Sequence, residues 1–186
     1  DILVLYSGSM GEKQGLELLI LAARQLQHLP HLRFVLCGEG SARPRLEALA
    51  VGADNLNLVP LQPAEMLNDL LNAADMHVLI QRAGAADLVM PAKLAGMLAS
   101  GRAVIATAEP DTELARVASQ AGRLIPPEDL QALCQAIVEL GNQPDLRRAL
   151  GERGRAYAQE NFDRAIILAR LEHTLRQVVH RPEPTV

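Results

Sequence analysis

Aromatic side chains and excess positive charge are both scarce in this sequence. Its 186 residues include two Tyr, two Phe and no Trp, and the formal net charge is −4. Proteins that bind nucleic acids usually stack bases on aromatic rings and surround the phosphates with cations. The composition therefore excludes nucleic acid as a partner, and the core has to be built from Leu, Ile, Val and Ala.

Cysteines and long apolar runs are scarce as well. Cys37 and Cys134 follow no metal-binding or redox spacing, and no two of the five His residues stand at the spacing of metal ligands, so no metal site is expected. His77 has no Ser, Cys or carboxylate at triad spacing and is expected to pack, which leaves the catalytic residues unknown. There is no apolar run of about 18 residues and no basic leader followed by an apolar segment. We expect a cytoplasmic protein without a transmembrane segment.

What the sequence does contain is a regular alternation of short apolar runs with segments of helical period, which is typical of a parallel sheet covered by helices. Helical spacing is clear ahead of Pro30, where one apolar stripe consists of Leu16, Leu19, Ile20, Ala23 and Leu26. The predicted strands are residues 2–7, 32–37, 56–61, 76–81, 103–107 and 122–125. The further helices between them are residues 42–50, 64–73, 92–100 and 112–120.

The pattern changes after Pro126 and Pro127, where it predicts only helices, over residues 129–140, 145–160 and 163–179. Asp145 and Asp163 are expected to be the N-caps of the last two helices. Residues 181–186 include two prolines and are expected to fray. The expected fold is α/β: one Rossmann-like doubly wound domain over residues 1–180, with a parallel sheet of about six strands and a helical C-terminal tail.

Ligands of such sheets bind beyond the carboxyl ends of the strands, so the loops that follow the strands are the candidate sites. The first loop carries Gly8, Gly11 and Gly15, whose spacing matches neither the dinucleotide fingerprint nor the P-loop. Either this loop contacts a ligand or it only makes a turn. Glu39, after the second strand, could hold ribose hydroxyls or be a solvated turn residue. Leu61, after the third strand, could offer backbone groups to a base.

The segment over residues 87–106 is the most informative one. Pro91 is suited to open a short helix, which is expected to end at Gly101 before the fifth strand. The first N–H groups of a helix lack partners within it and lie at the positive end of the helix dipole, where a phosphate can bind. Lys93 adds a positive charge in this first turn, and either it meets an anion or it is a solvated surface lysine. The residues of this segment alone leave both interpretations of Lys93 open.

The order of these segments is more specific than any one of them. The relevant stretches are residues 6–17, 34–40, 72–75, 90–94 and 99–107, continued by Glu113 and residues 122–128. On the basis of these stretches and their order, nearly all of residues 1–180 resembles the C-terminal, donor-binding domain of family 4 (group 1) glycosyltransferases with the GT-B fold. The form of residues 90–93 (MPAK) is most similar to bacterial enzymes of exopolysaccharide and colanic-acid assembly.

The resemblance implies a retaining enzyme that takes a sugar from a nucleoside diphosphate sugar. It also implies that neither a metal nor another cofactor is needed, because backbone amides and a basic side chain meet the diphosphate. On this interpretation the diphosphate is bound by Ala92, Lys93, Gly8, Ser9 and Lys13, the nucleoside by Gly38, Gly40, Leu61 and Gly96, and the donor sugar by Asp87, Leu88, Val89 and Met90.

The chain departs from the family pattern at some of these positions. Two glutamates that usually meet the donor sugar and the ribose fall on Leu88 and Gly96, and the usual Arg and Lys of the first loop fall on Ser9 and Gln14. Neither Leu88 nor Gly96 can accept hydrogen bonds through a side chain. Whether these losses abolish activity stays open at this point.

The resemblance also implies a partner, the N-terminal domain of the same full-length enzyme, which binds the acceptor and is absent from these residues. The fragment would then bind the donor without transferring its sugar, and the helix over residues 163–179 would expose an apolar face toward that domain. Peripheral association with the inner membrane through the absent domain is compatible with this interpretation.

Two alternatives remain. One is an NAD-binding Rossmann domain of an oxidoreductase, which Gly8, Gly11 and Glu39 favour. The other is a degenerate, non-catalytic sugar-nucleotide domain with a regulatory or assembly role, which the lost glutamates favour.

Overall fold

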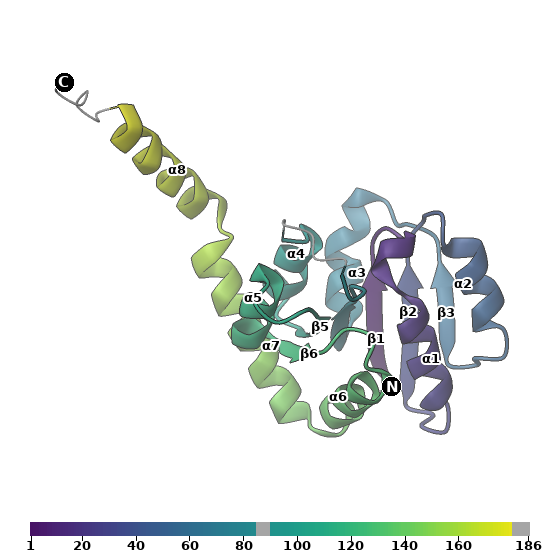
Figure 1. The fold of residues 1–186 in the computed structure, drawn as a ribbon. Coiled ribbons are helices and arrows are strands. Elements are labelled where there is room, and N and C mark those ends of the chain that lie inside the picture. The colour runs from purple at the N-terminus through teal and green to yellow at the C-terminus, as the bar shows by residue number, and fades with distance from the viewer. Residues whose placement is uncertain (85–89, 180–186) are drawn as a thin grey trace.

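A computed structural model describes residues 1–84 and 90–179. In these residues one parallel sheet is formed by β1 (Ile2–Ser7), β2 (Leu32–Cys37), β3 (Leu56–Val59), β4 (Met76–Leu79), β5 (Ala103–Thr107) and β6 (Arg123–Ile125). The strand order is β3-β2-β1-β4-β5-β6 (Figure 1). This is the order of a Rossmann sheet, so the predicted fold class is confirmed.

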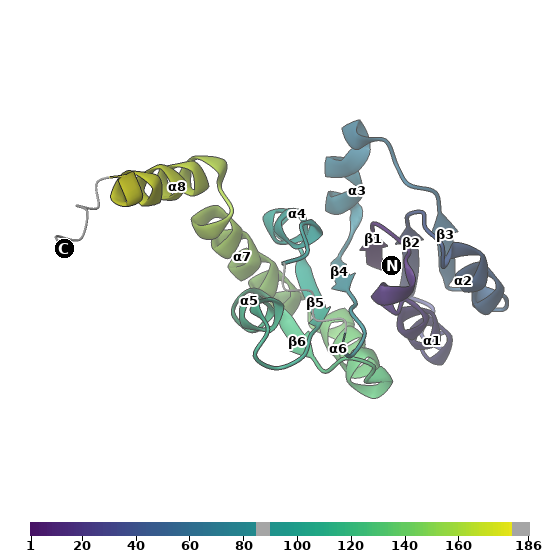
Figure 2. The ribbon, with the colours of Figure 1, turned by 45° about the horizontal axis from the view of Figure 1, so that its top comes forward.

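Helices cover both faces of the sheet (Figure 2). One face carries α1 (Glu17–Gln25), α2 (Arg43–Ala50) and α6 (Leu130–Asn142), and the other carries α3 (Leu67–Ala73), α4 (Lys93–Ala99) and α5 (Glu113–Ala121). Short 3-10 helices, Glu12–Gln14 and Ala64–Met66, precede α1 and α3. The long helix α7 (Pro144–Asn161) contributes to both faces, because Leu150 packs in one core and Ala158 in the other.

The buried strands explain why there is a core on each face. Val4 and Tyr6 of β1 pack in the core beneath α1, whereas Leu5, between them, packs with residues near α3. Successive side chains of a strand point to opposite faces, so a strand covered on both sides reads as a continuous apolar run. The buried residues are mostly Leu, Ile, Val and Ala, as the composition required, although Tyr6 and Phe34 are among the largest fully buried side chains.

Two strands end earlier than predicted. β3 ends at Val59 and β4 at Leu79, before the predicted ends at residues 61 and 81. Pro60 has no N–H with which to continue the β3 ladder. The Gln81 N–H donates to Thr107 Oγ1 (2.7 Å) instead of to a strand carbonyl, so the chain has left the sheet at this residue.

Helix ends also differ at two places. α1 ends at Gln25 rather than near Pro30, although Leu26 stays buried in a turn that the Leu29 N–H closes on the Leu26 carbonyl (2.9 Å). The expectation that Asp145 is an N-cap is wrong. α7 begins at Pro144, because the missing N–H of a proline costs nothing at the first helical position, and Gln143 is the N-cap. Asp163 does cap the last helix, since its carboxylate accepts from the Ala165 N–H (2.8 Å).

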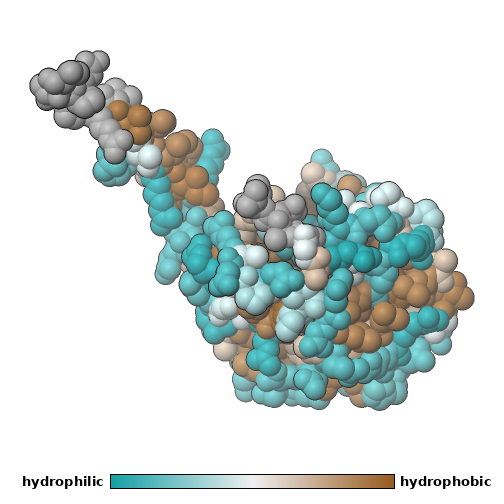
Figure 3. Space-filling view, viewed as in Figure 1, coloured by the Kyte–Doolittle hydropathy of each residue, from teal (hydrophilic) through white to brown (hydrophobic). Residues whose placement is uncertain are grey.

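The last helix, α8 (Arg164–Val179), projects away from the rest of the molecule (Figure 1). It carries an apolar stripe that is visible on the projecting helix in Figure 3 and consists of Ile167, Leu168, Leu171, Leu175 and Val178, all of them exposed. Residues 181–186, predicted to fray, lie outside the described residues. Within the described ranges, no helix combines the length and the apolar character needed to cross a membrane.

Candidate functional site

The candidate site lies at the carboxyl ends of β1 and β4. β1 pairs with β2 on one side and with β4 on the other. The chain reaches β2 through α1 and β4 through α3, which lie on opposite faces of the sheet. In open α/β sheets a binding crevice forms where the strand order reverses in this way.

Two cavities occupy this crevice. The first cavity has a volume of about 240 Å³ and is lined by Ser7, Gly8, Cys37, Leu61, Gln62, Leu67, Leu70, Leu71, Ala92, Lys93 and Gly96. The second cavity has a volume of about 250 Å³ and is lined by Ser9, Lys13, Gln14, Leu79, Ile80, Gln81, Pro91, Ala92 and Lys93. Ala92 and Lys93 border both cavities, so the start of α4 separates them.

Lys93 is the central side chain of the site. Its Nζ donates to Tyr6 Oη (2.9 Å) and lies 4.5 Å from the centre of the Tyr6 ring. Tyr6 Oη in turn donates to the Ser9 carbonyl. In the part of the chain that the structure describes, Lys93 forms no ion pair with a carboxylate. A buried aromatic side chain of β1 therefore holds an ammonium group whose charge no carboxylate of the described residues neutralises.

Burial sets the protonation of both partners. It lowers the pKa of Lys93 to about 8, because desolvation disfavours the charged form. It also raises the pKa of Tyr6 well above the usual value, so the phenol stays neutral and keeps its proton for the Ser9 carbonyl. A half-buried ammonium of this kind is stabilised by an anionic oxygen at hydrogen-bond distance. The border between the cavities is thus suited to a phosphate group.

Two glycines hold the loops after β1 and β2 against each other. The Gly8 N–H donates to the Cys37 carbonyl (2.9 Å), and the Met10 N–H donates to the Glu39 carbonyl (2.8 Å). A Cβ at Gly38 would lie 1.9 Å from the Gly8 carbonyl oxygen, and one at Gly40 would lie 2.4 Å from that of Met10. Neither Gly38 nor Gly40 lines a cavity. Both glycines lie where the two loops approach each other so closely that a side chain would not fit.

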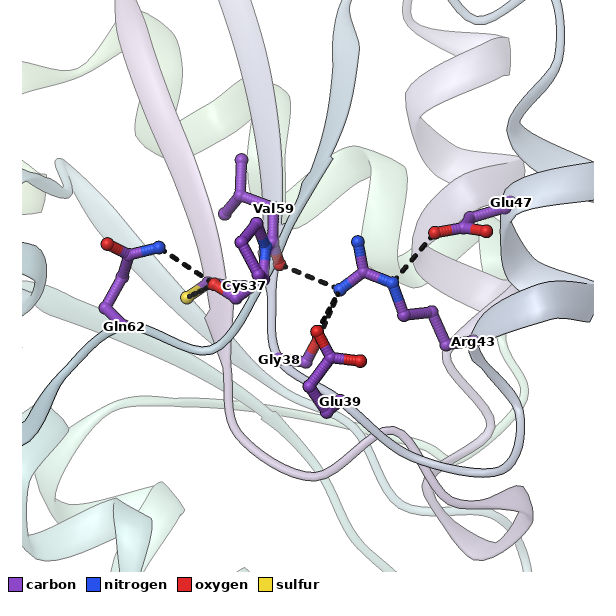
Figure 4. A network of polar contacts seen from close by, with 8 residues as sticks. Cys37, Gly38, Glu39, Arg43, Glu47, Val59 and Gln62 are labelled. Carbon is purple, nitrogen blue, oxygen red and sulfur yellow. Dashed lines mark hydrogen bonds and ion pairs between the residues drawn. The ribbon is translucent and has the colours of Figure 1, made fainter.

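Arg43 fixes the carboxyl ends of β2 and β3. Its guanidinium donates to the carbonyls of Gly38 (2.6 Å) and Val59 (3.2 Å) and pairs with Glu39 (3.0 Å) and Glu47 (2.8 Å). Figure 4 shows the Glu39 carboxylate turned toward this guanidinium. The structure therefore does not bring Glu39, a candidate for holding ribose, to either cavity.

A second ion network ties the loop after β1 to the loop after β4. Arg82 Nε donates to the Glu12 carbonyl (2.8 Å), and the same guanidinium pairs with Glu17 (2.9 Å), which also contacts Arg45. Burial alone would raise the pKa of Glu17, but a backbone hydrogen bond together with Arg45 and Arg82 outweighs it and lowers the pKa. These contacts join the two segments that contribute Lys13 and Gln81 to the lining of the second cavity.

The remaining predicted site residues divide between the two cavities. Three of them, Gly8, Leu61 and Gly96, line the first cavity, and two, Ser9 and Lys13, line the second. Met90 is half-buried and packs on the core that includes α4 and α5. Asp87, Leu88 and Val89 lie outside the described residues.

Several lining residues were not anticipated from the sequence. One wall of the first cavity is made by Leu67, Leu70 and Leu71 of α3. Their helical spacing is a signal, but the same spacing marks any helix that packs on a sheet. Gln81 was placed in a strand, and Gln14 was noted only for the cation that it replaces. Both line the second cavity.

His77 packs in the interior, as expected. Its Nε2 lies 3.2 Å from Ser100 Oγ, and burial, assisted by the charge of Arg102, lowers its pKa to about 4. Over residues 1–84 and 90–179, no three His, Cys, Asp or Glu side chains gather where they could hold a metal ion.

Comparison with known proteins identifies the family to which the chain belongs. Residues 1–143 match the family described as "Glycosyl transferases group 1". Over 179 residues the chain is 36% identical to the putative colanic acid biosynthesis glycosyl transferase WcaI of Escherichia coli K12, covering 94% of this chain and 43% of that protein. The chain thus spans less than half the length of this relative.

Solved structures agree with the sheet described above. Sucrose-phosphate synthase from Thermosynechococcus elongatus superposes with a TM-score of 0.79 at 25% identity, over 96% of this chain and 46% of that one. Anabaena HepE, in complex with UDP-glucose, superposes with a TM-score of 0.77 at 16% identity, over 95% and 49% of the two chains. At 16% identity, the similarity to HepE shows the fold alone. The match over residues 1–143 shows that the chain belongs to the group 1 glycosyl transferases.

Proposed function

We propose that the two cavities bind a nucleoside diphosphate sugar, and that the chain is the donor-binding part of a retaining glycosyltransferase in bacterial polysaccharide assembly. The observation that carries the proposal is Lys93, an ammonium group without a carboxylate partner among the described residues, which lies between an apolar cavity and a more polar one. A nucleoside diphosphate sugar has the same order of parts: a base and ribose, two phosphates, and a polar sugar.

In this arrangement the nucleoside lies in the first cavity, against Leu61 and Gly96. Lys93 and Ala92 meet the diphosphate, with Gly8, Ser9 and Lys13 around it. The sugar lies toward the second cavity and the segment that ends at Met90, in which Asp87, Leu88 and Val89 are the further candidates. We propose that Lys93 supplies the charge that a metal ion supplies to diphosphates elsewhere, so that binding needs no metal.

The acceptor is proposed to bind elsewhere in a longer protein. The chain covers 43% of the length of the Escherichia coli relative, which leaves room for a second domain with the acceptor site and further catalytic groups. We propose that this second domain precedes residues 1–180, that it packs on the exposed stripe of α8, and that it carries any peripheral contact with the inner membrane. The protein is proposed to act in the cytoplasm on a glycan or lipid-linked acceptor.

A non-catalytic role is the second candidate, because Gly96 lines the first cavity and brings no carboxylate into it, at a position where the family resemblance implies a glutamate. Titration calorimetry with UDP, GDP, ADP and NAD, each with and without magnesium, separates the candidates. Saturable binding of one nucleoside diphosphate, unchanged by magnesium, is expected. Binding of NAD alone would indicate an oxidoreductase domain, and an absence of any binding would favour the degenerate domain.

A further inference from the structure

Two carboxamide side chains line the second cavity without hydrogen-bond partners in the described part of the chain. Gln14 ends the 3-10 helix after β1, and Gln81 follows β4. Both side chains are half-buried and line the second cavity together with Ser9 and Lys93. Among the residues that the structure describes, neither carboxamide makes a hydrogen bond. Half-buried amides of this kind are free to bind a ligand.

The backbone beneath both side chains is anchored. The Gln81 N–H donates to Thr107 Oγ1 (2.7 Å), and the Gln81 carbonyl accepts from the same hydroxyl (2.9 Å). The Gln14 N–H donates to the Gly11 carbonyl (3.2 Å). The two amides therefore reach the cavity from fixed positions on different elements, which is how a specific binding site is preorganised.

The lining of the second cavity includes two cations, Lys13 and Lys93. Arg82, the neighbour of Gln81, is occupied by the Glu12 carbonyl and the Glu17 carboxylate. Lys93 lies at the border with the first cavity, and Lys13 is exposed. Among the described residues, the other polar side chains of this lining are the Ser9 hydroxyl and the two neutral carboxamides, each of which offers two N–H donors and one carbonyl acceptor.

This chemistry matches hydroxyl groups better than phosphates. A hydroxyl both donates and accepts hydrogen bonds, and so does a carboxamide, whereas ammonium and guanidinium groups only donate. Phosphate oxygens only accept and bind most strongly to cations. We propose that Gln14 and Gln81 bind hydroxyl groups of the donor sugar and thereby determine which sugar the protein accepts. The proposal rests on the proposed function above.

The test compares each diphosphate with its sugar conjugate. Calorimetric titrations of the chain and of the variants Gln14→Met and Gln81→Met use UDP and UDP-glucose, GDP and GDP-mannose, and ADP and ADP-glucose. Methionine keeps the length of the side chain and removes its hydrogen bonds. For the base that the chain binds, each substitution is expected to raise the Kd of the nucleotide sugar about tenfold and to leave that of the diphosphate within about twofold.

Gln25→Met is the matched control, because Gln25 lies at the end of α1, outside both cavities, and pairs with Gln131. It is expected to change neither Kd. Equal weakening of the diphosphate and its sugar conjugate, or no change in either, would overturn the role of the two glutamines. Equal affinity of the unaltered chain for both members of every pair would overturn it too. A chain that binds none of the six probes would instead refute the proposed function.

Discussion

At the scale of single residues, the position of Lys93 links burial to charge. The Tyr6 ring and hydroxyl hold the ammonium group half-buried, and this burial brings its pKa to about 8. At neutral pH most molecules still carry the charge. The described residues give this ammonium no carboxylate partner, so the cost of burying its charge falls when an anion binds beside it.

Replacement of this ammonium is the first prediction. Lys93→Ala is expected to weaken binding of the preferred nucleoside diphosphate by about 1–3 kcal/mol, the scale of a charged hydrogen bond. Lys13→Ala is the control and is expected to have a smaller effect, because Lys13 is exposed at the rim. Calorimetry on variants with unchanged circular dichroism measures both. An unaltered affinity in folded Lys93→Ala would remove Lys93 from the site.

The second prediction concerns pH. Well below pH 8 Lys93 is charged and its contribution to affinity is complete; as the pH rises through about 8 the free chain loses this proton and the contribution declines. A nucleotide sugar is the suitable ligand, because its diphosphate does not titrate in this range. The Kd is expected to rise between pH 7.5 and 9.5. This range of about two pH units is wide enough to follow the titration of one group. The rise should be absent in Lys93→Ala.

Individual site residues could be predicted only where the signal is local. Pro91, Lys93 and Gly101 lie within one short segment, and the structure begins α4 at Lys93 and ends it just before Gly101, which has a φ of 72°. Gly38 offers no such signal, because the Gly8 carbonyl that excludes a side chain there comes from the loop after another strand, β1. Gln81 could be noticed only once the true end of β4 was known.

At the scale of elements, the approach of the loops after β1 and β2 supports the third prediction. In Gly38→Ala the new Cβ would lie 1.9 Å from the Gly8 carbonyl oxygen, so the loops must separate. The free energy of unfolding is expected to fall by about 3 kcal/mol, at the upper end of the usual cost of overpacking. Urea denaturation measures it.

Gly96→Ala is the comparison for this variant. Its Cβ would meet only Leu71 Cδ1, at 3.4 Å, and alanine favours a helix by about 1 kcal/mol over glycine. This variant should be at least as stable as the unaltered chain. If Gly38→Ala proved equally stable, the close approach of the loops would not be needed for folding.

The fourth prediction concerns α8. Its large apolar side chains from Ile167 to Val178 are exposed, and the helix adds no residue to the buried cores. A chain that ends at Phe162 is expected to keep its free energy of unfolding within about 1 kcal/mol, because little apolar area is buried by the removed part. It should also self-associate less, which analytical ultracentrifugation can detect. A loss of several kcal/mol would show that α8 stabilises the domain.

The ranges of the elements were largely predictable because burial on both faces leaves long apolar runs. β1, β2 and β5 occupy the predicted residues. The errors fall where a single backbone group decides the outcome, as at Pro60, which lacks a donor, and at Pro144, which starts α7 ahead of Asp145. The hydropathy pattern does not show at which residue such a backbone group ends a strand or starts a helix.

At the scale of the whole molecule, the buried His77 makes stability depend on pH, which is the fifth prediction. Above pH 6.5 the ring is neutral in both the folded and the unfolded chain. Between pH 6.5 and 4 the unfolded chain binds a proton that the folded chain does not, so stability falls as pH falls. The full effect is about 3 kcal/mol, from a pKa lowered to about 4 at 1.36 kcal/mol per unit.

Urea denaturation between pH 4.5 and 7.5 measures this slope. His77→Gln keeps a polar group near Ser100 and cannot be protonated, so the curve of its unfolding free energy should be flatter over the same range. An equally steep slope in His77→Gln would assign the acid sensitivity to other groups.

The position of Lys93 between the two cavities has a consequence for calorimetry itself. At pH 8 about half of the free molecules lack the proton on Nζ, as the pKa of about 8 requires. An anionic ligand at that border stabilises the protonated form, so binding draws protons from the solution. The measured heat should therefore change with the ionisation enthalpy of the buffer, and in this molecule binding of the donor is coupled to proton uptake.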